Sequence, residues 1–373
     1  MWLADSMGIR GGAFTAFTFI SLCVIATATG SSIGTMFTAF PIFYPAGVLL
    51  GCNPAVLAGA ILSGAIFGDN LAPISDTTIM SASTQEYKKG GTADIGGVVS
   101  SRLKYSLVAG IIATVLFFIF GGGHSIGEGA SEMLEASMNS KSLIMLVPVV
   151  IMLLVSVRTR SIYKAITAGL ILGSAAGLIF GLIKPADIAN VADGAPGGFL
   201  VKGIFNMMGT VTLVISVFGI MGVLRSAGAF DMIIKAILNS GAGKSARGTE
   251  LISAAGICIT TLLFGGVTSA AIITFGPILN QVGKEKDIHP YRRANLLDGF
   301  ANSIPVCVPF LSVFVYIGAL LVQGYEFVKP LNAAEIASGM FYPMCLFVVL
   351  LVSVFIGWGR TYEGENGEQL KKR

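Results

Sequence analysis

The chain has 373 residues, of which 54% are hydrophobic and only 12% are charged, with a net charge of +4 and a mean hydropathy of +0.81. Soluble domains carry about 25% charged residues, and a soluble chain of this composition would expose apolar patches far beyond the usual few hundred Å². The hydrophobic residues also form long uncharged blocks. The sequence therefore excludes a soluble protein and predicts an all-α integral membrane protein, a polytopic helical bundle.

Two irregular apolar stretches open the chain, at 14–50 and 53–84, and both carry Gly, Pro and polar residues in their interiors. We expect a re-entrant hairpin in the first and a broken helix in the second, which together form a first transport repeat over 1–103. The N-terminus lacks the basic segment of a signal peptide, because Asp5 precedes Arg10.

Asp69 and Asp76 lie inside the second stretch, with no Lys or Arg in the same spanning segment. An acid at mid-membrane costs about 2.5–3.5 kcal/mol on insertion scales, so such residues usually have a function. Pro73 cannot donate a backbone hydrogen bond and disfavours helical angles at Ala72, which predicts the break in the helix. Ser75 or Asp76 can then cap a second half-helix, and capping is the alternative role of Asp76.

The middle of the chain, residues 104–249, is expected to form connecting transmembrane helices that act as a scaffold. Its spans are almost free of charge and cover 104–122, 142–157, 165–183 and 204–224. The positive-inside rule places the basic loops in the cytoplasm, together with the C-terminal tail. These loops lie near 88–104, 158–164, 225–247 and 284–293.

The stretch 250–282 lies between two loops that are both expected in the cytoplasm. It must therefore leave and return on one side of the membrane, as a hairpin around Gly265 and Gly266. A broken helix over 294–322 completes a second transport repeat over 250–323. Residues 324–373 then supply a final helix and a cytoplasmic C-terminus.

The two hairpins share a sequence pattern. Residues 30–42 align with residues 266–278 without a gap, and the matching pairs are Gly30 with Gly266, Thr38 with Thr274, Pro41 with Pro277 and Ile42 with Ile278. The first broken helix runs toward a basic loop and the second runs away from one, so the repeats have opposite orientation. Inverted repeats with interrupted helices are the best sequence indication of a transporter's central site.

Asp298 is a third acid inside an apolar stretch, in the second broken helix. We expect it to have an auxiliary role in ion binding. Arg292 and Arg293 lie within two helical turns of it, so pairing with a base is the alternative.

Carboxylate, hydroxyl, amide and carbonyl oxygens suit small hard cations such as Na⁺ or Li⁺. A carboxylate that holds either a cation or a proton is a minimal antiport device, because the two exclude each other. The expected ion- and proton-binding residues are Asp69, Asn70, Ser75, Asp76, Thr77, Thr78, Asp298, Asn302 and Ser303, with Na⁺ at Asp69 and Asp76. The expected cavity-lining residues are Gly30, Ser31, Ser32, Thr35, Pro73, Gly266, Thr268, Ser269 and Pro305. For each Ser and Thr, a hydrogen bond to the helix backbone is the alternative.

Other classes of function find little support. The five cysteines lie in or beside apolar segments without metal-ligand spacing, and the chain has two histidines. It has no histidine cluster, no Ser-His-Asp set and no Cys-His set, which disfavours an enzyme. We expect no cofactor besides the transported Na⁺ and H⁺, and no nucleic-acid partner. A channel is a further alternative and would show passive, uncoupled flux.

The motif around Asp69, Phe67-Gly-Asp-Asn-Leu-Ala-Pro-Ile-Ser-Asp-Thr-Thr78, closely resembles the signature of the NhaC family of Na⁺/H⁺ antiporters within the larger ion-transporter superfamily. Thr29-Gly-Ser-Ser-Ile-Gly-Thr35 and Leu297-Asp-Gly-Phe-Ala-Asn-Ser-Ile-Pro305 resemble looser patterns of that family. The resemblance spans essentially the whole chain. It implies an inverted-repeat helical fold, Na⁺/H⁺ exchange by alternating access in a bacterial-type inner membrane, and often a homodimer.

The resemblance also suggests an alternative transported substrate, and the chain differs from the family pattern in two ways. Relatives exchange organic acids, and one branch of short proteins is linked to tetracycline efflux, so an organic solute or drug is the alternative. Phe40, Phe43, Tyr44 and Phe310 are candidates to line the larger cavity that a drug needs. Family members usually have several helices before the Gly30 region, so we expect a short member or an N-terminally truncated one. The second acid lies in Leu-Leu-Asp-Gly-Phe instead of an acid-Ser-Gly-Thr pattern.

Overall fold

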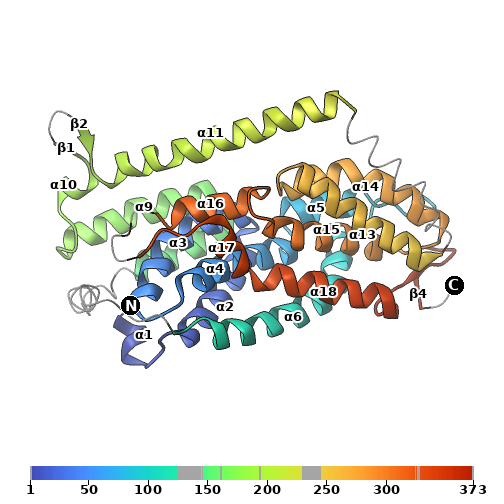
Figure 1. Ribbon diagram of the computed structural model, residues 1–373, viewed down its shortest axis with the longest axis horizontal. Helices are drawn as coiled ribbons and strands as arrows, with labels where there is room; N and C mark the ends of the chain where they lie inside the picture. The colour runs from blue at the N-terminus through green and yellow to red at the C-terminus, as the bar shows by residue number, and fades with distance from the viewer. Residues whose placement is uncertain are drawn as a thin grey trace.

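The computed structural model describes residues 2–123, 144, 146–159, 162–192, 195–228, 245–323, 325 and 328–371. Within these residues nearly all regular structure is helical (Figure 1). The strands form two short antiparallel pairs, β1 (Asn190–Ala192) with β2 (Ala195–Gly197) and β3 (Tyr362–Glu363) with β4 (Gln369–Leu370). The prediction of an all-α fold is thus confirmed.

The first repeat region begins with the short helix α1 (Trp2–Ser6). A hairpin follows, and then a helix in two pieces: α2 (Gly12–Thr29), α3 (Ser32–Leu49), α4 (Pro54–Leu71) and α5 (Asp76–Ser83). Gly30 turns the hairpin with φ +67°, a left-handed angle that glycine adopts without strain. Ala72 is extended, as expected for the residue before Pro73, and this ends α4.

The second repeat region has the same order of elements: α13 (Ala246–Leu263), α14 (Thr268–Glu285), α15 (Pro290–Ala301), the 3₁₀ turn η3 (Ile304–Cys307) and α16 (Val313–Leu321). Two of its helices start at the same spacing from their counterparts. Ser32 and Thr268 begin α3 and α14, and Pro54 and Pro290 begin α4 and α15, each pair 236 residues apart. Gly30 and Gly266 have the same spacing, and both have left-handed φ angles. The match therefore extends beyond residues 30–42.

The two hairpins lie in opposite halves of the molecule. In Figure 1, α2 and α3 lie in the half that carries the N-terminus, and α13 and α14 lie in the half that carries the C-terminus. The second piece of each broken helix packs on the other repeat's hairpin, α5 against α14 and α16 against α3. This exchange joins the repeats into one bundle.

The remaining helices flank this pair of repeats. They are α6 (Ile95–Phe120), α8 (Leu146–Thr159), α9 (Ile162–Ile179), α10 (Pro185–Ile188), α11 (Phe199–Ser226), α17 (Ala333–Ser338) and α18 (Phe341–Ile356). α11 runs along the outside of the bundle (Figure 1). Residue 160, residues 229–244 and the last two residues, all expected in basic loops or the tail, lie outside the described residues.

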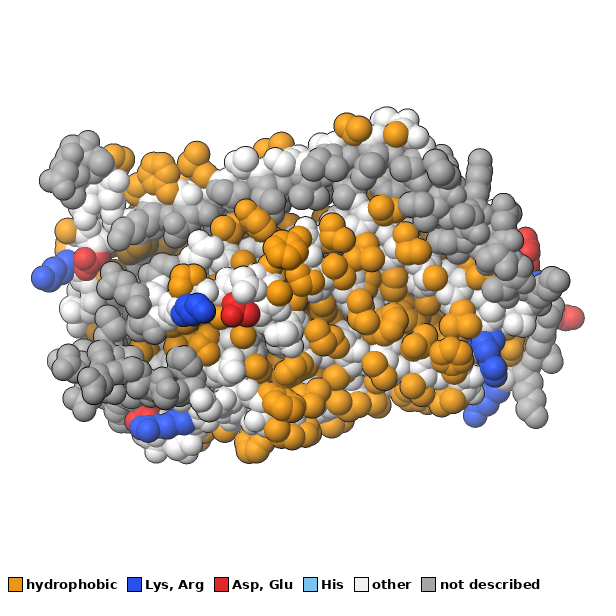
Figure 2. All heavy atoms as spheres, viewed as in Figure 1, with side chains coloured by type: hydrophobic (Ala, Val, Ile, Leu, Met, Phe, Trp, Pro, Cys, Tyr) orange, Lys and Arg blue, Asp and Glu red, His pale blue; other side chains and the backbone are white. Residues whose placement is uncertain are grey.

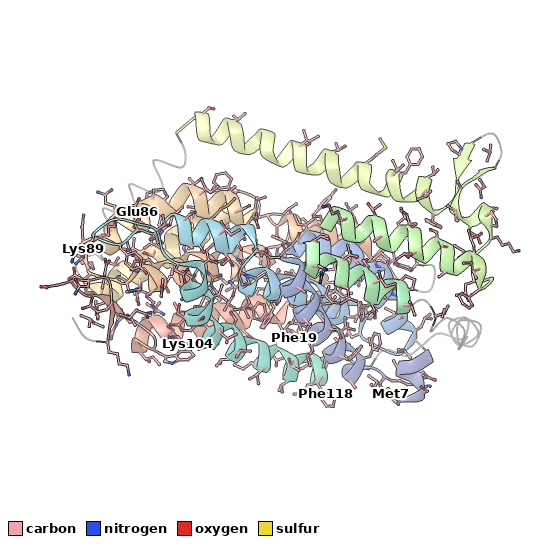
Figure 3. The ribbon with its side chains drawn as sticks, turned by 180° about the vertical axis from the view of Figure 1, so that it is seen from behind. Met7, Phe19, Glu86, Lys89, Lys104 and Phe118 are labelled. Atoms are coloured by element: carbon pink, nitrogen blue, oxygen red, sulfur yellow. The ribbon has the colours of Figure 1, made fainter. Side chains whose placement is uncertain are left out.

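Several helices have the length and the apolar composition of membrane-spanning segments. In the described part of the chain, four segments are long and apolar enough to cross one: Gly12–Thr29, Ser32–Leu49, Pro54–Ser83 and Ile95–Phe120. Figure 2 shows hydrophobic side chains across the middle of one face, with most charged side chains toward the ends. Seen from behind in Figure 3, Glu86 and Lys89 lie at one end and Met7 lies toward the other.

The start of α6 corrects one expectation. The span was predicted from residue 104, with Arg102 and Lys104 in a basic loop, but the helix begins at Ile95 and contains both. The Asp94 carboxylate caps it by accepting from the Gly97 amide at 2.7 Å. Arg102 is only 1% exposed. Hydropathy alone placed the start of this helix too late, because it counts Arg102 as an exposed charge. In the structure, partners from other helices satisfy that charge inside the protein.

Candidate ion-binding site

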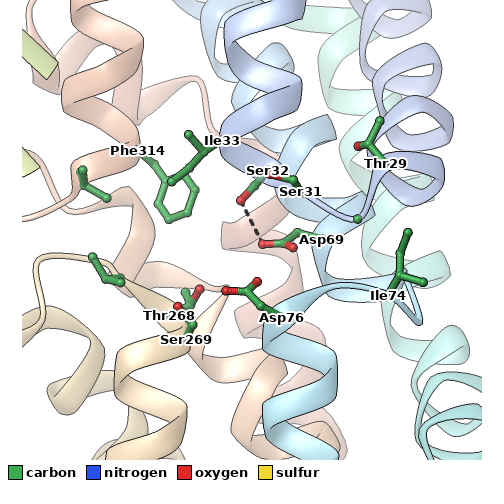
Figure 4. Close-up of a pocket in the computed structure, with 13 residues that line it drawn as sticks. Thr29, Ser31, Ser32, Ile33, Asp69, Ile74, Asp76, Thr268, Ser269 and Phe314 are labelled. Carbon is green, nitrogen blue, oxygen red and sulfur yellow. Dashed lines mark hydrogen bonds between the residues drawn. The ribbon is translucent and has the colours of Figure 1, made fainter. Parts of the chain in front are cut away.

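The tips of the two hairpins meet at a cavity of about 530 Å³ (Figure 4). Its walls come from the α2–α3 tip, the break between α4 and α5, the start of α14 and the start of α16. The lining residues are Thr29, Gly30, Ser31, Ser32, Ile33, Asp69, Ile74, Asp76, Val267, Thr268, Ser269, Val313 and Phe314. These described lining residues include two acids and no Lys or Arg, so the cavity has an anionic character.

Asp69 lies in the last turn of α4 and is 3% exposed. One carboxylate oxygen accepts from the Ser32 hydroxyl at 2.9 Å, and the other accepts from the Ser75 hydroxyl at 2.6 Å. Ser32 comes from the hairpin and Ser75 from the break, so both segments converge on this carboxylate. Ser75 also lies 3.0 Å from the Thr77 hydroxyl.

Asp76 is exposed and is the first residue of α5. One of its carboxylate oxygens accepts from the Thr77 amide at 2.9 Å. In Figure 4 its carboxylate faces Thr268 and Ser269 from the other hairpin. The Ser75 side chain makes no capping bond, because it donates to Asp69 instead.

Asn70 and Thr78 lie behind the cavity and do not line it. The Asn70 side-chain oxygen accepts from Ser106 at 2.8 Å, while the Asn70 carbonyl and the Thr78 hydroxyl both accept from Arg102. These two residues therefore face a second polar cluster, centred on Arg102.

Asp298 belongs to that second cluster. It is fully buried, does not line the cavity, and forms an ion pair with Arg102. The sequence favoured Arg292 or Arg293 as partners, but Arg292 pairs with Glu250 at 2.8 Å, and Arg293 donates to the Asn280 carbonyl at 2.8 Å. The structure therefore places a base beside Asp298, from a different helix than expected.

The other residues of the second break are also separate from the cavity. Asn302 donates to the Asp298 carboxylate at 2.5 Å, and Ser303 donates to the Phe300 carbonyl at 2.7 Å. Pro305 is buried in η3. The structure thus brings Asp69, Asp76 and the hairpin hydroxyls together, and leaves Asp298, Asn302 and Ser303 apart from them.

Several expected lining residues differ from the structure. Thr35 is buried and donates to the Ser31 carbonyl at 2.8 Å, which is the helix-backbone alternative. Thr35, Pro73, Gly266 and the four aromatic candidates are not among the lining residues. Sequence reasoning missed Thr29, Ile33, Ile74, Val267, Val313 and Phe314. Most of these directly adjoin the hairpin glycines or the break, so widening those motifs would have found them.

Two helical hairpins, two interrupted helices and carboxylates where the hairpin tips meet are the features of a secondary transporter. A family model described as the Na⁺/H⁺ antiporter family matches residues 3–121. This match and the relatives below agree with the resemblance found in the motifs: the chain is similar to NhaC-type Na⁺/H⁺ antiporters.

Three relatives illustrate this. A malate-2H⁺/Na⁺-lactate antiporter of Bacillus subtilis is 29% identical, over 68% of this chain and 54% of the relative. A protein of Haemophilus influenzae described as an uncharacterized Na⁺/H⁺ antiporter is 25% identical, over 80% of this chain and 66% of the relative. The Na⁺/H⁺ antiporter NhaC of Alkalihalophilus pseudofirmus is 25% identical, over 60% and 50% respectively. The chain matches about half to two thirds of the length of these relatives.

Proposed function

We propose that this protein exchanges Na⁺ or Li⁺ for H⁺ across the cell membrane by alternating access. The observation that carries the proposal is Asp69, a carboxylate held between a hairpin tip and a helix break, in a cavity whose described lining has no basic residue. A carboxylate without a basic partner is available to a proton or a metal cation. The similarity to Na⁺/H⁺ antiporters supports the same function.

The two hydroxyls on Asp69 suit this exchange. A hydroxyl donates to a bare carboxylate, and it turns an oxygen lone pair toward a bound cation when its hydrogen rotates away. Ser32 and Ser75 can therefore serve both states of Asp69 without a large rearrangement. Asp76 adds a second carboxylate to the lining of the cavity, from the other side of the same helix break. Competition between Na⁺ and H⁺ at these acids couples the two fluxes.

Alternating access has a structural basis in the paired repeats. Each hairpin tip reaches the same cavity, and each hairpin packs on part of the other repeat's broken helix. Rocking of one repeat against the other would open the cavity first to one side and then to the other.

The direct test uses everted membrane vesicles with an imposed pH gradient. Adding Na⁺ or Li⁺ should dissipate the gradient, whereas K⁺ and choline should have much smaller effects. Asp69→Asn should abolish the response. A wild-type protein that never responds to Na⁺ or Li⁺, or an Asp69→Asn variant that matches wild type, would overturn the proposal.

A second candidate is cation-coupled exchange of a small organic solute. The cavity volume of about 530 Å³ exceeds the needs of a bare ion, and Ile33, Val313 and Phe314 give it an apolar side. The relative from Bacillus subtilis is named for malate and lactate exchange. Labelled-solute uptake driven by a Na⁺ gradient, compared with the Na⁺-only response, separates the two candidates.

We further propose that the end carrying Lys88, Lys89, Lys284 and the described C-terminal residues faces the cytoplasm of a bacterial-type cell. Basic residues gather there, as the positive-inside rule requires. The homodimer implied by the family resemblance remains a prediction. Cysteine labelling at position 89, with a membrane-impermeant reagent on intact cells and on everted vesicles, tests the orientation.

A further inference from the structure

Arg102 occupies an unusual position at the contact between the two repeats. It lies on α6 and is 1% exposed, yet its guanidinium is fully engaged. Nη1 donates to the Asn70 carbonyl at 2.6 Å and to the Thr78 hydroxyl at 3.0 Å, and it pairs with the Asp298 carboxylate. Nε donates to Asn295 at 3.1 Å.

The three oxygens around Nη1 are the kinds that ligate a small cation. They are a backbone carbonyl, a hydroxyl and a carboxylate, which are hard ligands for ions such as Na⁺. They also come from both broken helices, since Asn70 lies in the last turn of α4, Thr78 lies in α5 and Asp298 lies in α15. One charged side chain on α6 therefore contacts both broken helices near their breaks.

A fourth oxygen adds an independent observation. Asn302 donates from its side-chain nitrogen to Asp298, while its side-chain oxygen is buried and has no hydrogen-bond partner in the described part of the chain. A buried acceptor without a donor is costly unless a ligand can reach it. Arg102 contacts one oxygen of the Asp298 carboxylate and the Asn302 amide contacts the other, so the unpartnered Asn302 oxygen belongs to a residue that touches the same carboxylate.

We propose that the guanidinium of Arg102 is a built-in cation that occupies a second cation site formed by Asn70, Thr78, Asp298 and Asn302. This inference rests on the proposed function and deepens it. The first repeat keeps its acid, Asp69, open to exchangeable ions, while the second repeat's acid is permanently occupied. Each chain therefore binds one exchangeable Na⁺, and removing the guanidinium creates a second Na⁺ site.

The test counts bound ²²Na⁺ on purified full-length protein in lipid nanodiscs. Wild type should bind about one ion per chain and Arg102→Ala about two. The double variant Arg102→Ala/Asp298→Asn should return to about one, and Arg102→Lys, which keeps a positive charge, should also bind one. Asp69→Asn should bind none, and Asp69→Asn/Arg102→Ala should bind one.

The outcomes separate this inference from the proposed function. If wild type binds no Na⁺, or Asp69→Asn binds as much as wild type, the proposed function fails. If wild type binds one ion and Arg102→Ala binds no second, the inference alone fails. The melting temperature provides a second readout. Na⁺ should raise the melting temperature of Arg102→Ala more than that of wild type, and choline is the control. An Arg102→Ala chain that cannot be recovered folded in Na⁺, while the double variant can, also overturns the inference.

Discussion

The two repeat regions share a backbone plan but differ in how they treat their acid. In the first, Asp69 borders a cavity and accepts hydrogen bonds from two hydroxyls. In the second, Asp298 is fully buried and paired with Arg102. The two broken helices thus each carry an acid, although at different positions along the helix: Asp69 is hydrogen-bonded without a basic partner, and Asp298 is paired with a base. A shared backbone plan thus accommodates different side chains in its two halves, and we expect the half that contains Asp69 to bind the exchanged ions.

The breaks differ as well. α4 runs for 18 residues and its break covers residues 72–75, whereas α15 runs for 12 residues and a longer break with a 3₁₀ turn covers 302–312. Phe310, in the longer break, has a positive φ of 66°. A left-handed angle is strained for a bulky residue. The first break is short, and its Ser75 donates to the Asp69 carboxylate. The second break is longer, and its Asn302 donates to Asp298, which forms the ion pair with Arg102.

The comparison predicts its largest effect at Asp69. Asp69→Asn should abolish Na⁺-dependent proton movement, because the amide cannot exchange a proton or neutralise a cation. Asp76→Asn should weaken the apparent Na⁺ affinity by roughly tenfold, equivalent to about 1.4 kcal/mol, because one of two carboxylates remains. Initial rates in everted vesicles across a Na⁺ titration measure both. Equal losses in the two variants would contradict the leading role of Asp69.

A second large effect is expected on stability. Removing one partner of a buried ion pair usually costs about 3–5 kcal/mol, because the other charge is left without compensation. Arg102→Ala in Na⁺-free buffer should therefore be far less stable than the charge-neutral double variant Arg102→Ala/Asp298→Asn. Thermal melts in nanodiscs compare the two. If the double variant is no more stable than the single one, the pair does not hold the repeats together.

The glycines beside the two acids should respond differently to a methyl group. A Cβ on Gly68 would lie 2.3 Å from the Thr27 backbone nitrogen, whereas a Cβ on Gly299 would lie 2.6 Å from the flexible end of Leu350. Gly68→Ala should destabilise by about 1–3 kcal/mol through overpacking, and Gly299→Ala by less. Gly203→Ala in α11, where a Cβ meets nothing within 4 Å, is the matched control. A Gly299→Ala effect larger than that of Gly68→Ala would go against this packing difference.

The smallest effect concerns the residues that cap α4 and α15. Asn53 accepts from the Ala55 amide at 3.1 Å, and His289 accepts from the Tyr291 amide at 3.2 Å. Burial lowers the pKa of His289, which also lies near Glu363 and Arg293. The folded chain therefore favours the neutral imidazole of His289. The contribution of this cap to stability is fully present above the unfolded pKa near 6.5, and it is lost as pH falls through the lower pKa of the folded chain.

Hydrogen exchange at the Tyr291 amide should therefore speed up by several-fold between pH 7.5 and 5.5, after correction for the intrinsic pH dependence of exchange. The Ala55 amide, whose cap does not titrate, is the internal reference. His289→Asn, which copies the first repeat's cap, should abolish the difference. A Tyr291 amide that tracks Ala55 at every pH would rule out this effect.

The hairpin turns, the first helix break and the importance of Asp69 could be predicted from the sequence. Gly30 and Gly266 mark real turns because glycine adopts left-handed angles without strain, and Pro73 marks a real break because proline restricts the backbone of the residue before it. Asp69 was identifiable because an acid without a nearby base is costly in a membrane. The partner of Asp298 was not identifiable, because Arg102 is 196 residues away and reads as part of a basic loop. Pairing across such a distance depends on tertiary packing, which local patterns do not encode.

The most direct test of the asymmetry between the repeats is Na⁺-driven proton movement in proteoliposomes, measured on three proteins side by side. Wild type should exchange, the double variant Arg102→Ala/Asp298→Asn should exchange at a reduced but measurable rate, and Asp69→Asn should not exchange. Exchange by Asp69→Asn, or its loss only in a correctly folded double variant, would contradict the assignment of ion exchange to the first repeat.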